Sequence, residues 1–330
     1  MALRKSVGQR TFASCTGPSG RDCGSAFCQR KGTGLTVSET ASDLQRKIGH
    51  VHELHELVRA MKALALSSIS LFEQAIISLE TYSQVVETSL GACFRDIGPI
   101  SPVFEQRIKS HHQGTSVIVF GTDHGLVGSF NRDIAKFTHE EIQSMAEPVQ
   151  VIAVGERASI QLLECGVVPE QTLKTPHSVP LITPLVSQVL AELDVSGTTA
   201  CHVLYHEPGF ATDYQPVNDQ VLPFDYRLSG RWTSIPWPGQ ALPEVLGGGT
   251  VALRSLIREF LFLTIYRACA LSITSENASR LSAMQRADQN IDTLMSELKS
   301  DYNRERQRLI DDDLFDVLSG YEALRKPGKN

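Results

Sequence analysis

The first long segment of the chain, from about Ala41 to Cys93, repeats apolar residues at spacings of three and four. This is the period of one face of an α-helix, and no proline interrupts the segment before Pro99. At 1.5 Å per residue the helix would be roughly 75 Å long, longer than a small domain is wide. The apolar positions that define the face are Leu44, Ile48, Val51, Leu54, Val58, Met61, Ala65, Ile69, Phe72, Ile76 and Leu79.

The last long segment, from Val251 to Leu324, has the same helical pattern, and no proline or glycine lies between Gly249 and Gly320. It predicts about 100 Å of continuous helix. A helix of this length cannot bury itself against a small globule, so we expect the two long helices to pair as an antiparallel coiled coil. Its apolar grid is Leu281, Met284, Ile291, Met295, Leu298, Tyr302 and Leu309, and Asp288 and Glu305 occupy the vacant positions of the seam.

The middle of the chain alternates short β-branched runs with helical stretches, which predicts a small α/β domain inserted between the helices. The strand candidates are SVIVF, VQVIAVG (149–155) and ACHVLYH (200–206), and the stretch ERASIQLLECG is an amphipathic helix that ends on Gly166. The predicted organisation is a tail (1–36), a first coiled-coil helix (40–95), an α/β, Rossmann-like domain (112–228), a Pro/Gly-rich connection (229–249) and a last coiled-coil helix (250–327).

The stretch HVHELHELV in the first helix invites a metal-site interpretation. His52 and His55 lie three residues apart, whereas the zincin motif H-E-x-x-H places its histidines four apart. The sequence therefore favours a solvated helix face that carries three histidines, His50, His52 and His55.

Composition limits the classes of function. The net charge of −6 and the pI near 5.9 argue against nucleic acid as the main partner, because phosphate binding depends on clustered Lys and Arg. The most apolar window, 253–272, contains Arg254, Arg258, Glu259 and Arg267, so it predicts a packed helix and not a membrane span. The seven cysteines form no C-x-x-C pair, so neither a zinc site nor a redox dithiol is indicated.

Residues 1–36 differ from the rest of the chain, because they are basic, rich in Gly and Ser and without periodicity. A transit peptide, a disordered tail and a start codon read too early all fit this composition.

The stretch FGTDHGLVGSFN (120–131) holds three glycines after a predicted strand. The dinucleotide fingerprint G-x-G-x-x-G fails here, since Asp123 stands two positions before Gly125, and no lysine follows in the register of a Walker loop. The pattern predicts a strand followed by a turn, with glycines where positive φ or close packing is needed.

Five segments in order resemble the γ subunit of rotary F-type ATP synthases, from about residue 40 to 327. GTDHGLVGSFN resembles the signature S-D-R-G-L-C-G-x-F-N, with Val127 and His124 in place of the usual Cys and Arg. LVRAMKALALSS resembles I-T-K-A-M-K-M-V-A-A-S of the first helix. The other matching segments are YQPVNDQVLPFD (214–225), SENASRLSAMQRADQNIDTLMSEL (275–298) and YNRERQRLIDDDLFDVLSGYEAL (302–324).

Departures from this pattern point to a subtype. HVHELHE replaces a strongly basic stretch of the first helix, and LIREFLFLTIYRA and IPWPGQALP add to a resemblance to γ of the divergent N-type ATPases, proposed to pump sodium. The choice of ion belongs to the membrane ring in such machines.

The resemblance implies a non-catalytic rotor shaft, with no cofactor, metal or nucleotide of its own, at the cytoplasmic face of a bacterial membrane. Its partners would be a ring of three α and three β subunits, the ε subunit and the c-ring. By motif alignment, the residues that touch the ring are Arg59, Met61, Lys62, Arg280, Arg306 and Gln307, and the fold signature of the insert is Asp123, Gly125, Leu126, Gly128, Phe130 and Asn131. Asp311 and Asp313 replace the Thr and Glu that are usual near the tip.

Three alternatives remain open from the sequence. A coiled-coil adaptor would form a stable homodimer, although Asp288 and Glu305 interrupt its seam. A nucleotide-dependent transferase would bind nucleotide through residues 115–228, against which the missing phosphate motifs argue. A proton-driven γ subunit would use residues 1–36 as a transit peptide.

Overall fold

The computed structural model describes residues 40–97, 114–145, 149–196, 200–209, 214–222, 232–237, 239, 243–245 and 249–325. The chain divides into two units, Met1–Thr40 and Ala41–Asn330, and every described helix and strand belongs to the second unit. The predicted tail, 1–36, lies outside the described residues, as does much of the connection 229–249.

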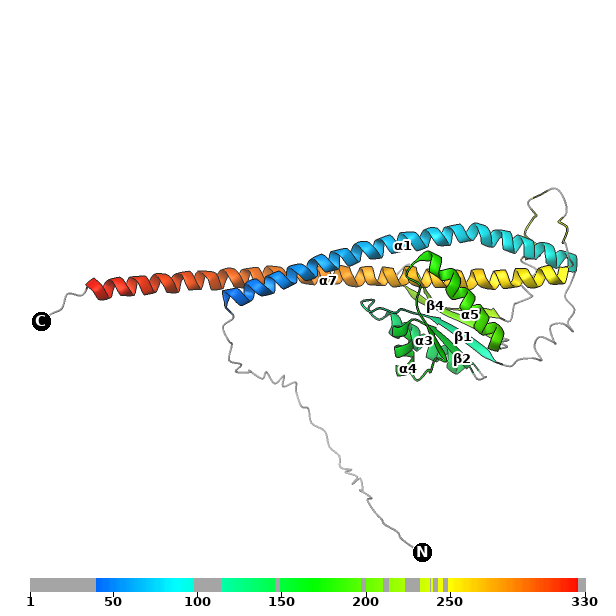
Figure 1. Cartoon of the computed structure of the whole chain (residues 1–330), viewed down its shortest axis with the longest axis horizontal. Helices are drawn as coiled ribbons and strands as arrows, with labels where there is room; N and C mark the ends of the chain where they lie inside the picture. The colour runs from blue at the N-terminus through cyan, green and yellow to red at the C-terminus, as the bar shows by residue number, and fades with distance from the viewer. Residues whose placement is uncertain are drawn as a thin grey trace, which may run out of the picture. The chain divides into compact units, whose positions relative to one another are not determined.

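Two long helices dominate this unit. Helix α1 (Ala41–Ile97) has 57 residues and helix α7 (Gly249–Arg325) has 77. They lie side by side and run in opposite directions (Figure 1), because Lys62 contacts Asp288 while Tyr82, later in α1, contacts Glu259, earlier in α7. We call α1 and α7 the helix pair. The predicted antiparallel pairing of the terminal helices is confirmed.

The segment between the helices forms one five-stranded sheet in the order β3-β2-β1-β4-β5. The strands are β1 (Thr115–Phe120), β2 (Val149–Val154), β3 (Gln171–Leu173), β4 (Ala200–Glu207) and β5 (Gln215–Leu222). Strands β1 to β4 are parallel, and β5 is antiparallel to β4. The alternation of strand and helix is confirmed, but β3 is new, because three residues are too few to form a recognisable apolar run.

Helices cover both faces of the sheet, as a mostly parallel sheet requires. Helices α3 (Phe130–Ser144) and α4 (Glu156–Glu164) pack on the face that carries Val117, Val119 and Val151. On the other face, which carries Ile118, Phe120 and Ile152, lie the short 3-10 helix η1 (Val179–Leu181) and helix α5 (Ile182–Ser196), together with α7. Residues of α7 from Ile265 to Ile273 share this core, so one continuous helix serves both the helix pair and the insert.

A separate core closes the helix pair near the end of α1. Phe94 and Trp232 stack with their ring centroids 6.0 Å apart, and Phe260 meets Trp232 edge-on at 5.5 Å. Val86, Leu90 and Leu263 complete this cluster. A Cβ at Gly91 would collide with the carbonyl oxygen of Trp232, so the close approach needs glycine there. The described part of the 229–249 connection is thus anchored by Trp232.

Candidate functional site

The loop after β1 is held by its own buried polar groups. The Asn131 side chain accepts from the backbone N–H of Thr122 at 3.0 Å and donates to the Thr122 hydroxyl at 2.7 Å. The Thr122 hydroxyl in turn donates to the carbonyl of His124 at 2.7 Å. These bonds close the loop on itself, and they satisfy donors that a phosphate loop would offer to its ligand.

Asp123 fastens three strand ends together. Its carboxylate accepts from the backbone N–H of Glu156, at the start of α4, and from that of Thr175, which follows β3, both at 2.9 Å. A carboxylate at this position also caps the positive end of α4. The carboxyl ends of β1, β2 and β3 are therefore tied at one point.

Positive φ occurs in this loop at Gly128 (61°) and at Leu126 (65°), but not at Gly125. The prediction of positive φ or close packing at the loop glycines is confirmed for Gly128 by its φ and for Gly121 by its close packing, because a Cβ at Gly121 would collide with the Ala158 side chain. Leu126 is 59% exposed, so its side chain gains nothing from packing that would explain the unusual backbone.

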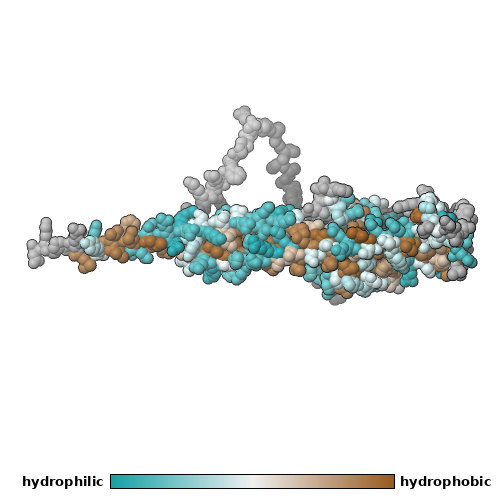
Figure 2. All heavy atoms as spheres, turned by 90° about the horizontal axis from the view of Figure 1, so that it is seen from above, coloured by the Kyte–Doolittle hydropathy of each residue, from teal (hydrophilic) through white to brown (hydrophobic). Residues whose placement is uncertain are grey.

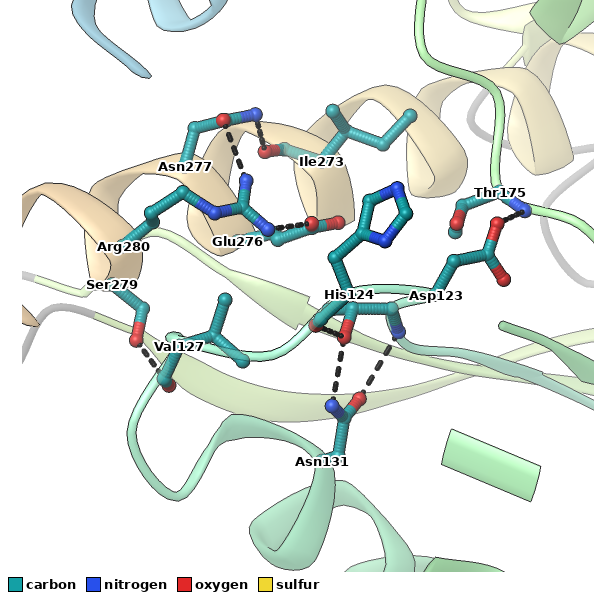
Figure 3. Close-up of polar contacts among 11 residues, drawn as sticks. Asp123, His124, Val127, Asn131, Thr175, Ile273, Glu276, Asn277, Ser279 and Arg280 are labelled. Carbon is teal, nitrogen blue, oxygen red and sulfur yellow. Dashed lines mark hydrogen bonds and ion pairs between the residues drawn. The ribbon is translucent and has the colours of Figure 1, made fainter. Parts of the chain in front are cut away.

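Polar side chains of α7 face the loop that carries Asp123 and His124 (Figure 3). Arg280 donates to Glu276 at 2.6 Å and to Asn277 at 3.0 Å. Burial raises the pKa of the Glu276 carboxyl, and the Arg280 guanidinium opposes that shift. One turn of α7 thus presents a buried ion pair to the sheet edge.

Two serines of α7 complete the contact between helix and insert. Ser279 donates to the carbonyl of Val127 at 2.7 Å, and Ser275 donates to the carbonyl of His206 at 3.1 Å. We call the set formed by the loop 121–131 and the α7 residues 273–280 the joint. Val127, Ser279 and His206 are all buried, so the joint is part of the core.

A cavity of about 910 Å³ lies beside the joint, at the carboxyl ends of the parallel strands. Open α/β sheets bind ligands at this edge. Here α7 crosses the edge with Glu276 and Arg280, while Phe72 of α1 closes another side. No group of three or more His, Cys, Asp or Glu side chains in the described ranges is arranged to hold a metal ion. The cavity thus lies between the insert, α1 and α7, next to the joint.

An aromatic cluster packs next to the joint, and His206 connects it to Ser275 and to Phe130. The rings of His206, Phe130 and Tyr214 all contact one another, with the His206 centroid 4.2 Å from Phe130 and 4.5 Å from Tyr214. The His206 Nε2 is 3.0 Å from the Phe130 carbonyl. Burial lowers the pKa of His206. The Tyr214 hydroxyl donates to Asp133 at 2.9 Å. The sequence did not predict this cluster, because the apolar and polar pattern of β4 does not distinguish a buried histidine from an exposed one.

In the helix pair, the side chains of His55, Lys62 and Asp288 meet between α1 and α7. Lys62 Nζ lies 2.7 Å from Asp288 Oδ2, and His55 Nε2 lies 3.0 Å from Asp288 Oδ1. The prediction that the histidine face is solvated is wrong for His55, whose side chain is only 14% exposed, although His50 and His52 are exposed. Leu54, predicted to be on the apolar face, is 53% exposed. His55 lies seven residues, or two helical turns, before Lys62. Both side chains therefore lie on the face of α1 that contacts α7.

The predicted ring-contact residues fall into two groups. Arg59, Arg306 and Gln307 are exposed, and Met61 is half-buried. Lys62 and Arg280 are instead engaged inside the chain, with Asp288 and with Glu276. The interpretation of these six as ring contacts stays a prediction, and the geometry favours the exposed residues.

The C-terminal end of α7 continues past the start of α1 and has no partner helix among the described residues (Figure 1). Apolar side chains gather there (Figure 2). They are Ile310, Leu314, Phe315, Val317, Leu318, Tyr321 and Leu324, each more than half exposed. A single chain rarely leaves such a surface uncovered, so it marks a contact with a partner.

By length and composition alone, α1 is the one helix in the described part of the chain that passes the test for a membrane span. The sequence had pointed to residues 253–272 as the most apolar window instead. Only 11% of the apolar window of α1 is buried within the chain. The Lys62–Asp288 pair, in the first half of α1, joins this helix to α7.

A family model described as ATP synthase matches residues 40–324, nearly the whole described chain. The chain belongs to the ATP synthase gamma-chain family. A gamma chain from Anaeromyxobacter sp. is 27% identical over 292 residues, which cover 86% of this chain and 98% of the relative. A gamma chain from Granulibacter bethesdensis is 26% identical over 305 residues, which cover 85% and 98%.

Chains in solved ATP synthase structures share the fold. In the cryo-EM structure of the Euglena gracilis mitochondrial ATP synthase described as OSCP/F1/c-ring, rotational state 3, one chain has a TM-score of 0.59 at 17% identity, covering 88% of this chain and 97% of that one. A chain of the rotor of the same enzyme, rotational state 1, has a TM-score of 0.56 at 16% identity, covering 82% and 98%. The gamma-chain fold predicted from the sequence is therefore confirmed.

Proposed function

We propose that this gamma chain is the central-stalk rotor of a membrane rotary ATP synthase, with its helix pair standing inside the ring of α and β subunits. The observation that carries the proposal is the uncovered apolar end of α7 on a chain of this family. The surrounding ring would cover this end of α7. The part of the helix pair that packs on the insert would lie outside the ring.

Rotation of such a shaft couples ion flow to catalysis. An asymmetric surface that turns inside the ring forces each β subunit through states of different nucleotide affinity, which is coupling between distant sites through packed elements. The gamma chain itself performs no bond chemistry. The joint holds the insert rigidly on α7, so that torque applied at the insert reaches the helix pair.

The contacts with partners follow from this orientation. Arg59, Met61, Arg306 and Gln307 would face the ring, where an exposed guanidinium suits a carboxylate on a partner loop. Lys62 and Arg280 would act indirectly, by holding Asp288 and Glu276. The insert and the lower helix pair would contact the ε subunit and the c-ring. The chain would sit at the cytoplasmic face of a bacterial membrane as a peripheral subunit that does not cross the bilayer.

The stretch HVHELHE and the apolar first helix support placement among the N-type ATPases. His55 gives a physical reason for the loss of basic residues in this stretch. Its side chain is only 14% exposed, and a Lys or Arg in its place would put a permanent charge between the helices.

Purification from native membranes through a tag on the α or β subunit tests the proposal. We expect this chain to co-purify as a single copy per ring, and mass spectrometry of its first residue will decide among the alternatives for residues 1–36. A chain found free of α and β and self-associated would overturn the rotor proposal in favour of the coiled-coil adaptor.

A further inference from the structure

The cavity beside the joint has one apolar wall that is part of the core. This wall is formed by Phe72 of α1, Leu173 of β3, Leu185 of α5 and Ile273 of α7. Each of the four side chains is less than a tenth exposed, so close packing fixes its position. The volume of about 910 Å³ lies in the range of pockets that bind small molecules. The cavity is therefore preformed and has room for an organic molecule of metabolite size.

The carboxylates that line the cavity are mostly occupied by partners within the chain. Both carboxylate oxygens of Asp123 accept backbone N–H groups, from Glu156 and from Thr175. The nearly fully buried Glu276 accepts from Arg280 at 2.6 Å. Among the lining acids of the described structure, only the exposed Glu156 has a side chain that makes no hydrogen bond or ion pair.

Three basic side chains at the rim of the cavity have no such partner. His124 lies in the loop after β1, and Lys174 and His177 lie in the loop after β3. All three are exposed, and their side chains make no hydrogen bond or ion pair with any described residue. The bond from the Thr175 N–H to Asp123 ties the two loops together next to His124 and Lys174 (Figure 3). Unpaired donors from two loops thus meet at one rim.

An apolar wall beside unpaired basic side chains is complementary to a molecule with an apolar body and an anionic group. We propose that this cavity binds a small organic anion, whose carboxylate or phosphate lies at His124, Lys174 and His177 and whose carbon body lies on the apolar wall. The Lys174 ammonium offers three donors, and each imidazole donates from at least one ring nitrogen. Hydrogen bonds from a charged donor to an anion are the stronger kind.

This site differs from the phosphate site of a dinucleotide fold. There the phosphate accepts from the N-terminus of the helix that follows a strand. Here the carboxylate of Asp123 accepts from that end of α4, through the N–H of Glu156. The anion is bound by side chains instead, so the missing phosphate motifs of the sequence do not argue against it.

A bound molecule would contact the insert and both long helices, because Phe72 belongs to α1 and Ile273 to α7. A ligand that binds only the folded arrangement stabilises it. The occupied cavity would therefore hold the insert more firmly on the helix pair. Its effect on the motor rests on the proposed function, whereas binding itself is a property of the chain.

A ligand-observed NMR titration of the full chain tests the site with three probes. Naphthoate has an aromatic body and a carboxylate, naphthamide has the same body without the charge, and inorganic phosphate has the charge without the body. We expect naphthoate to bind at least about fivefold more tightly than either of the other two, because only naphthoate makes both kinds of contact. Dodecanoate in a fourth titration distinguishes the sources: tighter binding than naphthoate assigns a lipid chain, and weaker binding assigns a compact acid.

Matched variants locate the binding in this cavity. Lys174→Gln should weaken naphthoate binding about fivefold and leave naphthamide binding unchanged, since it removes a charge and no apolar surface. Lys136→Gln, at an exposed position of α3 outside the cavity, should leave both unchanged. Ser68 lines the cavity from α1 and is half-buried, so Ser68→Phe should fill the space and weaken both probes.

Equal affinities for naphthoate and naphthamide would overturn the site. Naphthoate binding that neither Lys174→Gln nor Ser68→Phe weakens would overturn it as well, because the probe would then bind elsewhere on the chain. Failure to bind naphthoate in a chain that associates with α and β overturns the site and leaves the rotor proposal intact. If the parent chain never associates with α and β, the rotor proposal fails, and the titration of the chain alone still tests the cavity.

Discussion

Glu276 shows how the gamma chain keeps a charged group inside its core. The carboxylate is nearly fully buried, and the Arg280 guanidinium one turn away is its ion-pair partner. Removal of one member of such a pair leaves an uncompensated charge, which costs far more than the pair itself contributes. His206 is also buried, and burial lowers its pKa, so the core favours its neutral form.

Arg280→Met is therefore expected to destabilise the chain by about 3 kcal/mol at neutral pH. Burial already raises the pKa of Glu276, and the loss of Arg280 raises it further, so the carboxyl becomes neutral more readily. The destabilisation should consequently shrink as the pH falls. Thermal unfolding at neutral and acidic pH measures this, with Arg304→Met as the exposed control. Equal losses for the two variants would contradict the buried-pair argument.

His206 should make the stability of the chain depend on pH. Its pKa is lowered by burial, so the unfolded chain binds a proton more readily than the folded chain does. Stability from this group is complete above the ordinary value of 6.5 and is lost as the pH falls below it, by about 1 kcal/mol per pH unit. Melting temperatures across this range measure the loss. His206→Leu should flatten the pH dependence, whereas His52→Leu, on the exposed face, should leave it unchanged.

At the scale of elements, the strand ends of the insert approach one another more closely than side chains allow. Gly155, between β2 and α4, has a φ of 115°, and a Cβ there would lie within 2.7 to 2.9 Å of the Thr122 backbone. This contact brings the ends of β1 and β2 together next to Asp123. The element boundary thus depends on a glycine that the sequence pattern marks only as the end of a strand.

Gly155→Ala is expected to cost about 3 kcal/mol or to prevent folding, since backbone strain and a collision with backbone atoms add together. Gly166→Ala is the matched control, because Gly166 also has a positive φ, 83°, but has no atom near the added Cβ. Its cost should be about 1 kcal/mol from backbone strain alone. Denaturant unfolding of the purified chains gives both values. If the two substitutions cost the same, the close approach at Thr122 is not what requires glycine.

At the scale of the whole molecule, α7 joins three regions with different partners. Its first part closes the core around Trp232, its middle supplies a face of the insert, and its last part extends beyond α1. A continuous helix resists bending and twisting better than jointed segments do, which suits a shaft. The uncovered last part then depends on the ring for the burial of its apolar side chains.

Leu314→Asp combined with Leu318→Asp tests this dependence. Both side chains are exposed and lie four residues apart on one face, so the stability of the chain alone should not change. Co-purification with α and β should fall at least about tenfold, the result of losing little more than 1.4 kcal/mol of association free energy. Val168→Asp, at an exposed apolar position of the insert, is the control. Undiminished recovery of the double variant with the ring would show that this end of α7 is not a ring contact.

The sequence by itself determined the two long helices, their pairing and the inserted parallel strands. The apolar period of 3.6 residues and the short β-branched runs reflect local geometry, so they can be read without knowledge of the partner. The motif matches also determined the gamma-chain family. The helical period located the buried face of α1 only approximately. It placed Leu54 between the two helices, where the structure has His55.

Only the tertiary structure decided which polar residues meet. Lys62 and Asp288 are 226 residues apart in the chain, and Ser279 and Val127 are 152 apart. No local pattern encodes such contacts, because they exist only after α7 has packed against α1 and the sheet. For this reason Lys62 and Arg280, which look like free surface cations in the sequence, prove to be engaged inside the chain. The short strand β3 is likewise recognised by its pairing with β2 and not by its own three residues.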